Sequence, residues 1–260
     1  MWKMFTHDAV RALSMSFFAG MATLLGAFIV FIIKKKNEKF ITISLGFSAG
    51  VMISVSFNNL LPHAQEYLIA YSGEHIGVIL TVLFLIFGVS LTYGLDRLVP
   101  HDIIPAEGGK EHKNLFRVGF VSMLAITLHN FPEGIATFMS GYRDIELGIS
   151  IAIAISMHNI PEGISVATPI YFATGSKRKA FRFTLISALS EPVGAVLTFL
   201  ILRPFINNLM MGILFAFISG IMLYITIEEL IPSSRQYGHT RVALISTFIG
   251  ICLMPLANAI

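Results

Sequence analysis

Two copies of one short polar motif stand out in an otherwise apolar sequence. His-Asn-Phe-Pro-Glu-Gly at residues 129–134 recurs 29 positions later as His-Asn-Ile-Pro-Glu-Gly at residues 158–163. In each copy the imidazole and the carboxylate are four residues apart, so on a helix they lie on one face about one turn from each other. That spacing suits a shared metal ion, and the Asn next to each His offers a further oxygen.

A third carboxylate, Glu191, follows in Ser190-Glu191-Pro192. Like Glu133 and Glu162, it lies in an apolar stretch in which the nearest Lys or Arg is at least nine residues away. Placing an ionisable side chain in a membrane costs roughly 2.5 to 3.5 kcal/mol on insertion scales, so such residues are candidates for function. Cys252 is the single cysteine, which excludes a thiolate cluster and leaves nitrogen and oxygen ligands.

Simpler explanations exist for each part of this pattern. One copy of the motif is also typical of a proline-kinked helix whose polar groups satisfy one another, and Glu191 alone could be a protonated acid bonded to a helix carbonyl. Two copies together with Glu191 favour a metal cage. The candidate ligands are His129, Asn130, Glu133, His158, Asn159, Glu162 and Glu191.

The elements that position these residues must be membrane-spanning helices. The chain has 260 residues, of which 55% are hydrophobic and 13% charged, and apolar stretches recur along its whole length. We predict an all-α integral membrane protein with eight transmembrane helices in a single domain, 1–260, with a polar cytoplasmic loop at about 99–116. The predicted spans are roughly 10–33, 41–65, 76–98, 117–139, 146–170, 180–202, 207–231 and 241–259.

The two motifs fall in the fourth and fifth spans. Pro132 and Pro161 cannot donate a backbone hydrogen bond, so both helices are predicted to kink. A short loop around 141–146 makes the spans antiparallel, and copies of one motif on antiparallel neighbours imply inverted pseudo-symmetry. Matched proline-interrupted segments of this kind point to a transporter's binding site near the bilayer midplane.

Lys and Arg are distributed unevenly between the predicted loops. The loops after the first, third, fifth and seventh spans, together with the span ends that flank them, hold 14 of the 18 Lys and Arg residues. The positive-inside rule therefore predicts that these loops are cytoplasmic and that both termini are on the other side. Because the basic residues are spread over four loops, they do not indicate a nucleic-acid partner.

Polar residues elsewhere could line a path to the site. Asn59 and His63 lie in or near the second span, while Glu228 and Glu229 lie near the end of the seventh. Interfacial solvation explains the two glutamates equally well. We treat all four as possible pathway residues.

At these residues the chain resembles the ZIP (Zrt/Irt-like) family of metal transporters, most closely its bacterial members. The resemblance covers the whole chain. Besides the paired motif it includes residues 46–52, Ser190-Glu191-Pro192, and Glu228-Glu229-Leu230 with Pro232.

The resemblance implies eight helices with both termini outside the cytoplasm. It further implies a binuclear site in which His129, Glu133, His158 and Glu162 hold one ion. Asn130, Asn159 and Glu191 hold the second ion, and Glu133 and Glu162 bridge the two ions. Met52 matches a position that reaches the first metal, and Asn59 and Glu66 match positions at the outer mouth. Many relatives are acidic at Asn59, which leaves ion selection open.

The expected function is transport of divalent metal ions into the cytoplasm by alternating access, in a bacterial inner membrane. Imidazole and carboxylate ligands suit Zn²⁺, Fe²⁺, Mn²⁺ or Co²⁺, with Cd²⁺ as a further cargo, and affinity order favours Zn²⁺ over the first-row alternatives. No resident cofactor is expected. The expected partners are metal ions and the bilayer, with a homodimer left open.

Two alternative functions remain. One is a membrane metallohydrolase, although no His-Glu-x-x-His motif is present. The other is a passive channel that uses the same residues.

Overall fold

The computed structural model describes residues 6–32, 38–98, 110–202 and 207–257. Every element in this part of the chain is helical, which confirms the prediction of an all-helical protein. The helices are α1 (His7–Ile32), α2 (Glu38–Val55), α3 (Leu61–Ser72), α4 (Glu74–Leu98), α5 (Lys110–Arg143), α6 (Ile145–Thr174), α7 (Lys177–Leu197), α8 (Asn208–Ile225), α9 (Ile231–Arg235) and α10 (Thr240–Ala257). Short π-helical segments lie at Ser56–Leu60, Thr198–Leu202 and Thr226–Leu230.

Six helical stretches of the described chain are long and apolar enough to cross a membrane. They are His7–Ile32, Glu38–Ser72, Glu74–Gly94, Ile145–Thr174, Lys177–Ile201 and Asn208–Arg235. The fourth predicted span lies inside α5, and α10 covers the eighth as far as Ala257, with Thr240–Leu253 as a shorter apolar helix. Eight spans therefore remain a prediction. Helix α5 already begins at Lys110, within the stretch 99–116 that was predicted as a loop, and residues 99–109 lie outside the described part.

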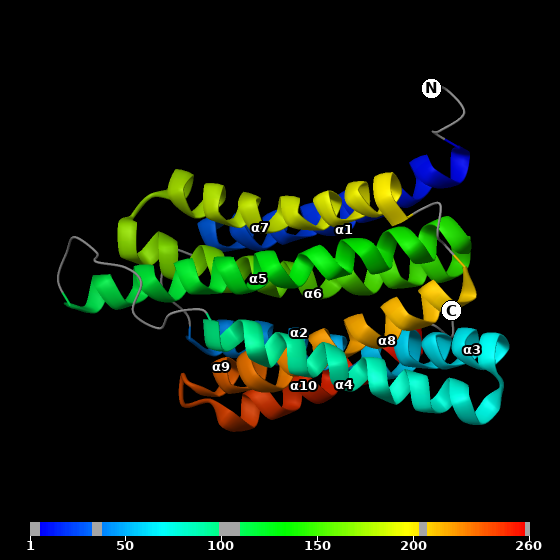
Figure 1. Ribbon diagram of the computed structural model, residues 1–260. Coiled ribbons are helices and arrows are strands. Elements are labelled where there is room, and N and C mark those ends of the chain that lie inside the picture. Colours follow the sequence, from blue (N-terminus) through cyan, green and yellow to red (C-terminus); the bar gives the residue numbers. More distant parts are fainter. Residues whose placement is uncertain (1–5, 33–37, 99–109, 203–206, 258–260) are drawn as a thin grey trace.

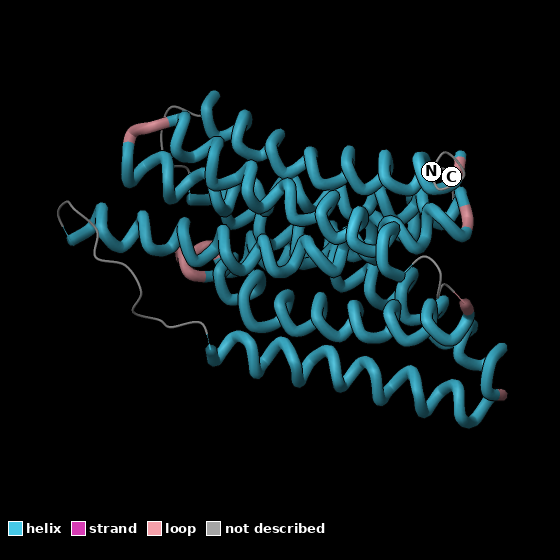
Figure 2. Tube along the Cα trace, turned by 45° about the horizontal axis from the view of Figure 1, so that its top comes forward, coloured by secondary structure: helices cyan, strands magenta, loops and turns pink. Residues whose placement is uncertain are grey.

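The helices form two bundles (Figure 1). The site bundle consists of α1, α5, α6 and α7, and the companion bundle of α2, α3, α4, α8, α9 and α10. The bundles meet mainly where α2 packs against α6. All helices run roughly along one direction, and the start of α1 and the end of α10 lie at the same end of the molecule (Figure 2).

Glycines bring helices into close contact inside each bundle. A Cβ on Gly163 of α6 would collide with the Thr23 carbonyl of α1, and one on Gly50 of α2 would collide with the Thr247 carbonyl of α10. Such close backbone approach requires glycine. By contrast, the contact between the bundles includes apolar side chains, among them Met52, Ile155 and Phe215.

A longer internal repeat relates the two main helices of the companion bundle. Residues 47–62, FSAGVMISVSFNNLLP, align without gaps to residues 217–232, FISGIMLYITIEELIP. The π-helical segments Ser56–Leu60 and Thr226–Leu230 occupy the same positions of the two copies. Each segment is followed by a proline in the first turn of the next α-helix, Pro62 or Pro232. Sequence reasoning missed this repeat, and α2 and α8 run in opposite directions (Figure 1).

Candidate metal site

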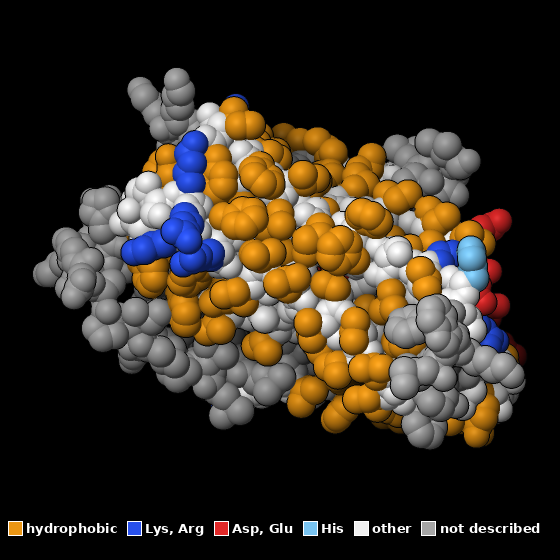
Figure 3. Space-filling model, turned by 90° about the horizontal axis from the view of Figure 1, so that it is seen from above, with side chains coloured by type: hydrophobic (Ala, Val, Ile, Leu, Met, Phe, Trp, Pro, Cys, Tyr) orange, Lys and Arg blue, Asp and Glu red, His pale blue; other side chains and the backbone are white. Residues whose placement is uncertain are grey.

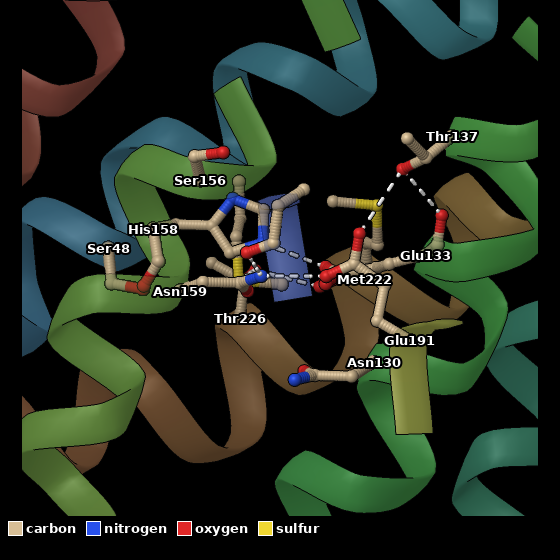
Figure 4. Close-up of polar contacts among 12 residues, drawn as sticks. Ser48, Asn130, Glu133, Thr137, Ser156, His158, Asn159, Glu191, Met222 and Thr226 are labelled. Carbon is tan, nitrogen blue, oxygen red and sulfur yellow. Dashed lines mark hydrogen bonds and ion pairs between the residues drawn. The ribbon is translucent and has the colours of Figure 1, made fainter. Parts of the chain in front are cut away.

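Three carboxylates meet inside the site bundle, one each from α5, α6 and α7. Glu133 and Glu191 are fully buried and Glu162 is 1% exposed. Asn130, His158 and Asn159 are buried as well. Figure 4 shows the His158 and Asn159 side chains of α6 pointing toward the carboxylates of Glu133 and Glu191. The structure thus brings together six of the seven candidate ligands; the side chain of His129 lies outside the described residues.

The imidazole of one motif contacts the carboxylate of the other. His158 Nε2 lies 2.9 Å from Glu133 Oε1, with both side chains fully buried. The contact joins α6 to α5. This pairing joins the two copies, in addition to the His-Glu spacing within each copy that the sequence shows, and it places the two motifs face to face.

Asn159 links α6 to both of its neighbours. Its Nδ2 donates to Glu191 Oε2 of α7 at 2.8 Å and to the main-chain oxygen of Ala19 of α1 at 2.9 Å. Its Oδ1 is buried and has no hydrogen-bond partner among the described residues. Because an unpaired buried carbonyl oxygen is costly, an amide oxygen held in this way is suited to bind a cation.

Asn130 occupies the equivalent position in the first motif. With its amide turned so that the nitrogen faces acceptors, it donates to Glu162 Oε2 at 3.3 Å and to the Ile126 carbonyl at 3.0 Å. In the opposite orientation the nitrogen donates to the Ser187 carbonyl of α7 at 3.3 Å. The first orientation satisfies both polar atoms of the amide, so it is the better assignment. Each motif Asn therefore contacts a carboxylate on another helix.

The motif glycines explain why α7 packs so closely against α5, and α1 against α6. A Cβ on Gly134 would collide with the main-chain oxygen of Glu191, and Gly163 stands in the same relation to Thr23. A Cβ on Gly194 of α7 would likewise collide with the main-chain oxygen of Phe131 in α5. The glycine after each Glu thus lets a third helix approach the site, a role that the motif spacing alone did not reveal.

Thr137 is a site residue that sequence reasoning missed. Its hydroxyl, one turn after Glu133, lies 2.9 Å from the Glu133 carbonyl and 3.5 Å from Glu191 Oε1, and it is fully buried. A Thr four residues after a motif Glu was a signal in the sequence, but Thr in membrane helices commonly bonds only its own backbone. The contact with Glu191 depends on how closely α5 and α7 pack.

Among the described side chains, no three His, Cys, Asp or Glu residues are grouped closely enough to hold an ion by themselves. The carboxylates are instead spaced by imidazole and amide groups, in the contacts given above. The donor set is nitrogen and oxygen, which fits Zn²⁺ and related divalent ions when Asn oxygens are included.

The predicted pathway residues lie in helices of the companion bundle or in the π-helical segments that adjoin them. Met52 is fully buried, and its sulfur accepts a 3.7 Å contact from the Thr226 hydroxyl. Asn59 is 4% exposed and donates to Ser150 Oγ at 3.4 Å. His63 is half-buried, with Nδ1 2.7 Å from the Asn59 carbonyl. Glu66 and Glu228 are exposed and Glu229 is half-buried.

Comparison with known proteins gives a consistent picture. A sequence model of the ZIP zinc transporter family matches residues 104–258. A protein named zinc transporter ZupT from Oceanobacillus iheyensis is 42% identical over 96% of this chain and 97% of its own length. Proteins of the same name from Streptococcus mutans and Chlorobaculum parvum are 42% and 44% identical, over 92% and 95% of this chain and 93% and 96% of their own lengths.

Proposed function

We propose that this chain, which belongs to the ZIP zinc transporter family, carries divalent metal ions, zinc first, across a membrane through the buried side chains of α5, α6 and α7. The relatives reported above are named transporters rather than enzymes. The observation that carries the proposal is the burial of Glu133, Glu162 and Glu191 in adjoining helices, each within contact distance of an imidazole or amide from another helix.

Bare carboxylates in this position would be strongly destabilising, whereas divalent cations would neutralise them. In the proposed binuclear arrangement, Glu133 and Glu162 bridge two ions. His129 and His158 complete the first ion's ligands, and Asn130, Asn159 and Glu191 complete those of the second. A bound ion would replace the His158–Glu133 contact, while Asn159 would keep its bond from Nδ2 to Glu191 and offer Oδ1 as a ligand.

The two bundles provide a physical basis for alternating access. Backbone contacts at glycines hold the helices within each bundle, while Met52, Ile155 and Phe215 belong to an apolar cluster shared by both bundles. Interlocked backbones resist relative movement more than an apolar side-chain surface does. We therefore infer that the site bundle moves as a unit against the companion bundle and exposes the ions first to one side and then to the other.

The finer topology is part of the same proposal. Figure 3 shows Lys and Arg gathered at one end of one face and acidic residues at the opposite end. By the positive-inside rule the basic end is cytoplasmic, and the start of α1 and the end of α10 then lie on the other side. We propose eight spans in a single domain, with Pro132 and Pro161 kinking their helices, and inward transport across a bacterial inner membrane. A homodimer stays a prediction.

The decisive test is Zn²⁺ uptake into proteoliposomes. The unchanged protein is compared with Glu162→Ala and His129→Ala, and with Glu74→Ala, which alters an exposed glutamate at the start of α4. Saturable uptake that is lost in the first two variants and kept in the third supports a carrier with its site in α5 and α6. Equal uptake by all four proteins contradicts the site.

The same assay distinguishes a carrier from a passive channel. A passive channel would use the same ligands but would show flux that keeps rising with Zn²⁺ concentration, whereas a carrier saturates. Countertransport is the second criterion: unlabelled Zn²⁺ inside the vesicles accelerates labelled uptake by a carrier.

A further inference from the structure

Four exposed cations cluster at the start of α7. This basic patch consists of Lys177, Arg178, Lys179 and Arg182. Figure 3 shows Lys and Arg side chains gathered at one end of the face that α7 and α1 form, bordered by hydrophobic side chains. Between Glu162 and Glu191 the sequence contains no Asp or Glu, and no ion pair is recorded for these four residues within the described chain.

Aromatic rings from three helices lie next to the patch. The Phe28 ring of α1 is 5.9 Å from Phe181 of α7 and 6.2 Å from Phe31, which is 6.0 Å from Tyr171 of α6. Lys177 Nζ lies 5.7 Å from the centre of the Phe31 ring, a cation–π distance. Phe28 is 50% exposed, so part of this aromatic surface faces outward.

The depth of these groups in a membrane follows from their chemistry. Tyr and Trp are enriched at the boundary between hydrocarbon and headgroups, and Tyr171, whose ring is 6.0 Å from Phe31, places the patch at that depth. Lys and Arg side chains extend from there toward water, with their charged ends at the level of the phosphates. Clusters of cations next to a membrane helix favour anionic lipids. A zwitterionic headgroup offers the same phosphate but adds a cation that the patch repels.

We propose that the basic patch binds the headgroup phosphate of an anionic phospholipid whose acyl chains lie against the adjoining rings of Phe28 and Phe181. The patch belongs to the site bundle: Arg182 precedes Glu191 by nine residues on α7, a rise of about 13 Å. A lipid held here contacts the same rigid unit that carries the metal ligands, at the end of the molecule where the other loops are also basic. Lipid binding itself does not depend on the proposed transport activity.

The experiment uses the purified full chain in a neutral detergent. Dioleoylphosphatidylglycerol is titrated in while the thermal unfolding midpoint is recorded, with dioleoylphosphatidylcholine and glycerol 3-phosphate as parallel titrants. Lys179→Gln/Arg182→Gln is compared with the matched control Lys39→Gln/Arg241→Gln, which removes the same two residue types from exposed positions on α2 and α10. Lys179→Arg, which keeps the charge, tests whether the position itself tolerates substitution.

The midpoint is expected to rise with phosphatidylglycerol and to respond little to the other two titrants. Half-maximal response should need about ten- to thirtyfold more phosphatidylglycerol in Lys179→Gln/Arg182→Gln, with no such change in the control or in Lys179→Arg. High salt should weaken the response of the unchanged protein. Equal responses of the two double variants overturn the proposal, as does a phosphatidylcholine response equal to that of phosphatidylglycerol. An equal response to glycerol 3-phosphate would assign the patch to soluble phosphates.

Discussion

Asn159 and Glu191 are joined by a 2.8 Å hydrogen bond from amide nitrogen to carboxylate oxygen, between α6 and α7. Because the same nitrogen also donates to Ala19 of α1, the amide cannot turn without losing two contacts. Its oxygen is thereby held in one direction. The arrangement makes Asn159 both a ligand candidate and the residue that positions Glu191.

We predict that Asn159→Ala removes the second metal ion and leaves the first. The substitution takes away an oxygen ligand and the donor that orients Glu191, while His158 and Glu133 keep their contact. Isothermal titration with Zn²⁺ should show the stoichiometry fall by one ion. Asn58→Ala, at an exposed position, is the matched control and should keep the original stoichiometry; an unchanged stoichiometry in Asn159→Ala would refute the assignment.

Thr137→Val should weaken metal binding without unfolding the protein. Valine has nearly the same shape but cannot contact Glu191 Oε1 through a hydroxyl, and loss of a residue that orients a ligand typically costs about ten- to a hundredfold in metal affinity. Thr137→Ser keeps the hydroxyl and should restore most of the affinity. A purely structural role for Thr137 predicts instead that both variants change the unfolding midpoint and neither changes affinity.

Zn²⁺ affinity should fall as the pH is lowered. A cation binds the deprotonated forms of imidazole and carboxylate, so protons compete with it and binding releases them. Between pH 7.5 and 5.5 we expect the dissociation constant to rise by about tenfold or more. Titrations in two buffers of different ionisation enthalpy would count the released protons, and release of none would contradict the ligand set.

Gly134→Ala should destabilise the fold. The added Cβ would collide with the main-chain oxygen of Glu191, and overpacking of this kind typically costs about 1 to 3 kcal/mol. Gly94→Ala in α4 is the control, since its Cβ would meet nothing within 4 Å. The unfolding midpoint in detergent should drop for the first variant only; equal midpoints would mean that α5 and α7 can separate without cost.

Joining the two bundles covalently should stop transport. Asn59 of the companion bundle and Ser150 of the site bundle are in side-chain contact at 3.4 Å, and Cys252 is the one cysteine that must first be replaced. Asn59→Cys/Ser150→Cys on a Cys252→Ser background should lose uptake on oxidation and regain it on reduction. Uptake by each single-cysteine variant should not change when the oxidant is added. Full uptake by the oxidised, cross-linked protein would exclude relative movement of the bundles.

Hydropathy and motif spacing predicted a large part of this structure. Six of the predicted spans coincide, to within a few residues at most ends, with helical stretches long and apolar enough to cross a membrane, because lipid selects long apolar helices; the total of eight stays a prediction. The motifs predicted which polar residues share a helix face. They could not predict that His158 contacts Glu133 rather than a residue of its own copy, since that depends on how α5 and α6 pack. The contribution of α1, through the Ala19 carbonyl, involves no distinctive side chain at all.

The repeat of residues 47–62 in 217–232 was visible in the sequence but easily overlooked, since only five of its 16 positions are identical and four more exchange one aliphatic residue for another. Its π-helical segments could not be anticipated, because no residue type reliably specifies them. Six candidate ligands converge in the structure, as their spacing suggested, but metal binding by them stays a prediction, as does a pathway role for the exposed Glu66 and Glu228.

The two copies of that repeat have the same helical backbone pattern but differ in charge. Where the first copy has Asn58 and Asn59, the second has Glu228 and Glu229, and because α2 and α8 are antiparallel the amide pair and the acidic pair lie toward opposite ends of the molecule. We propose that a cation moving between these ends would leave amide oxygens and approach carboxylates. Since the repeat carries acidic residues in one copy only, two similar helical frames would present different electrostatic surroundings at the two ends of such a route.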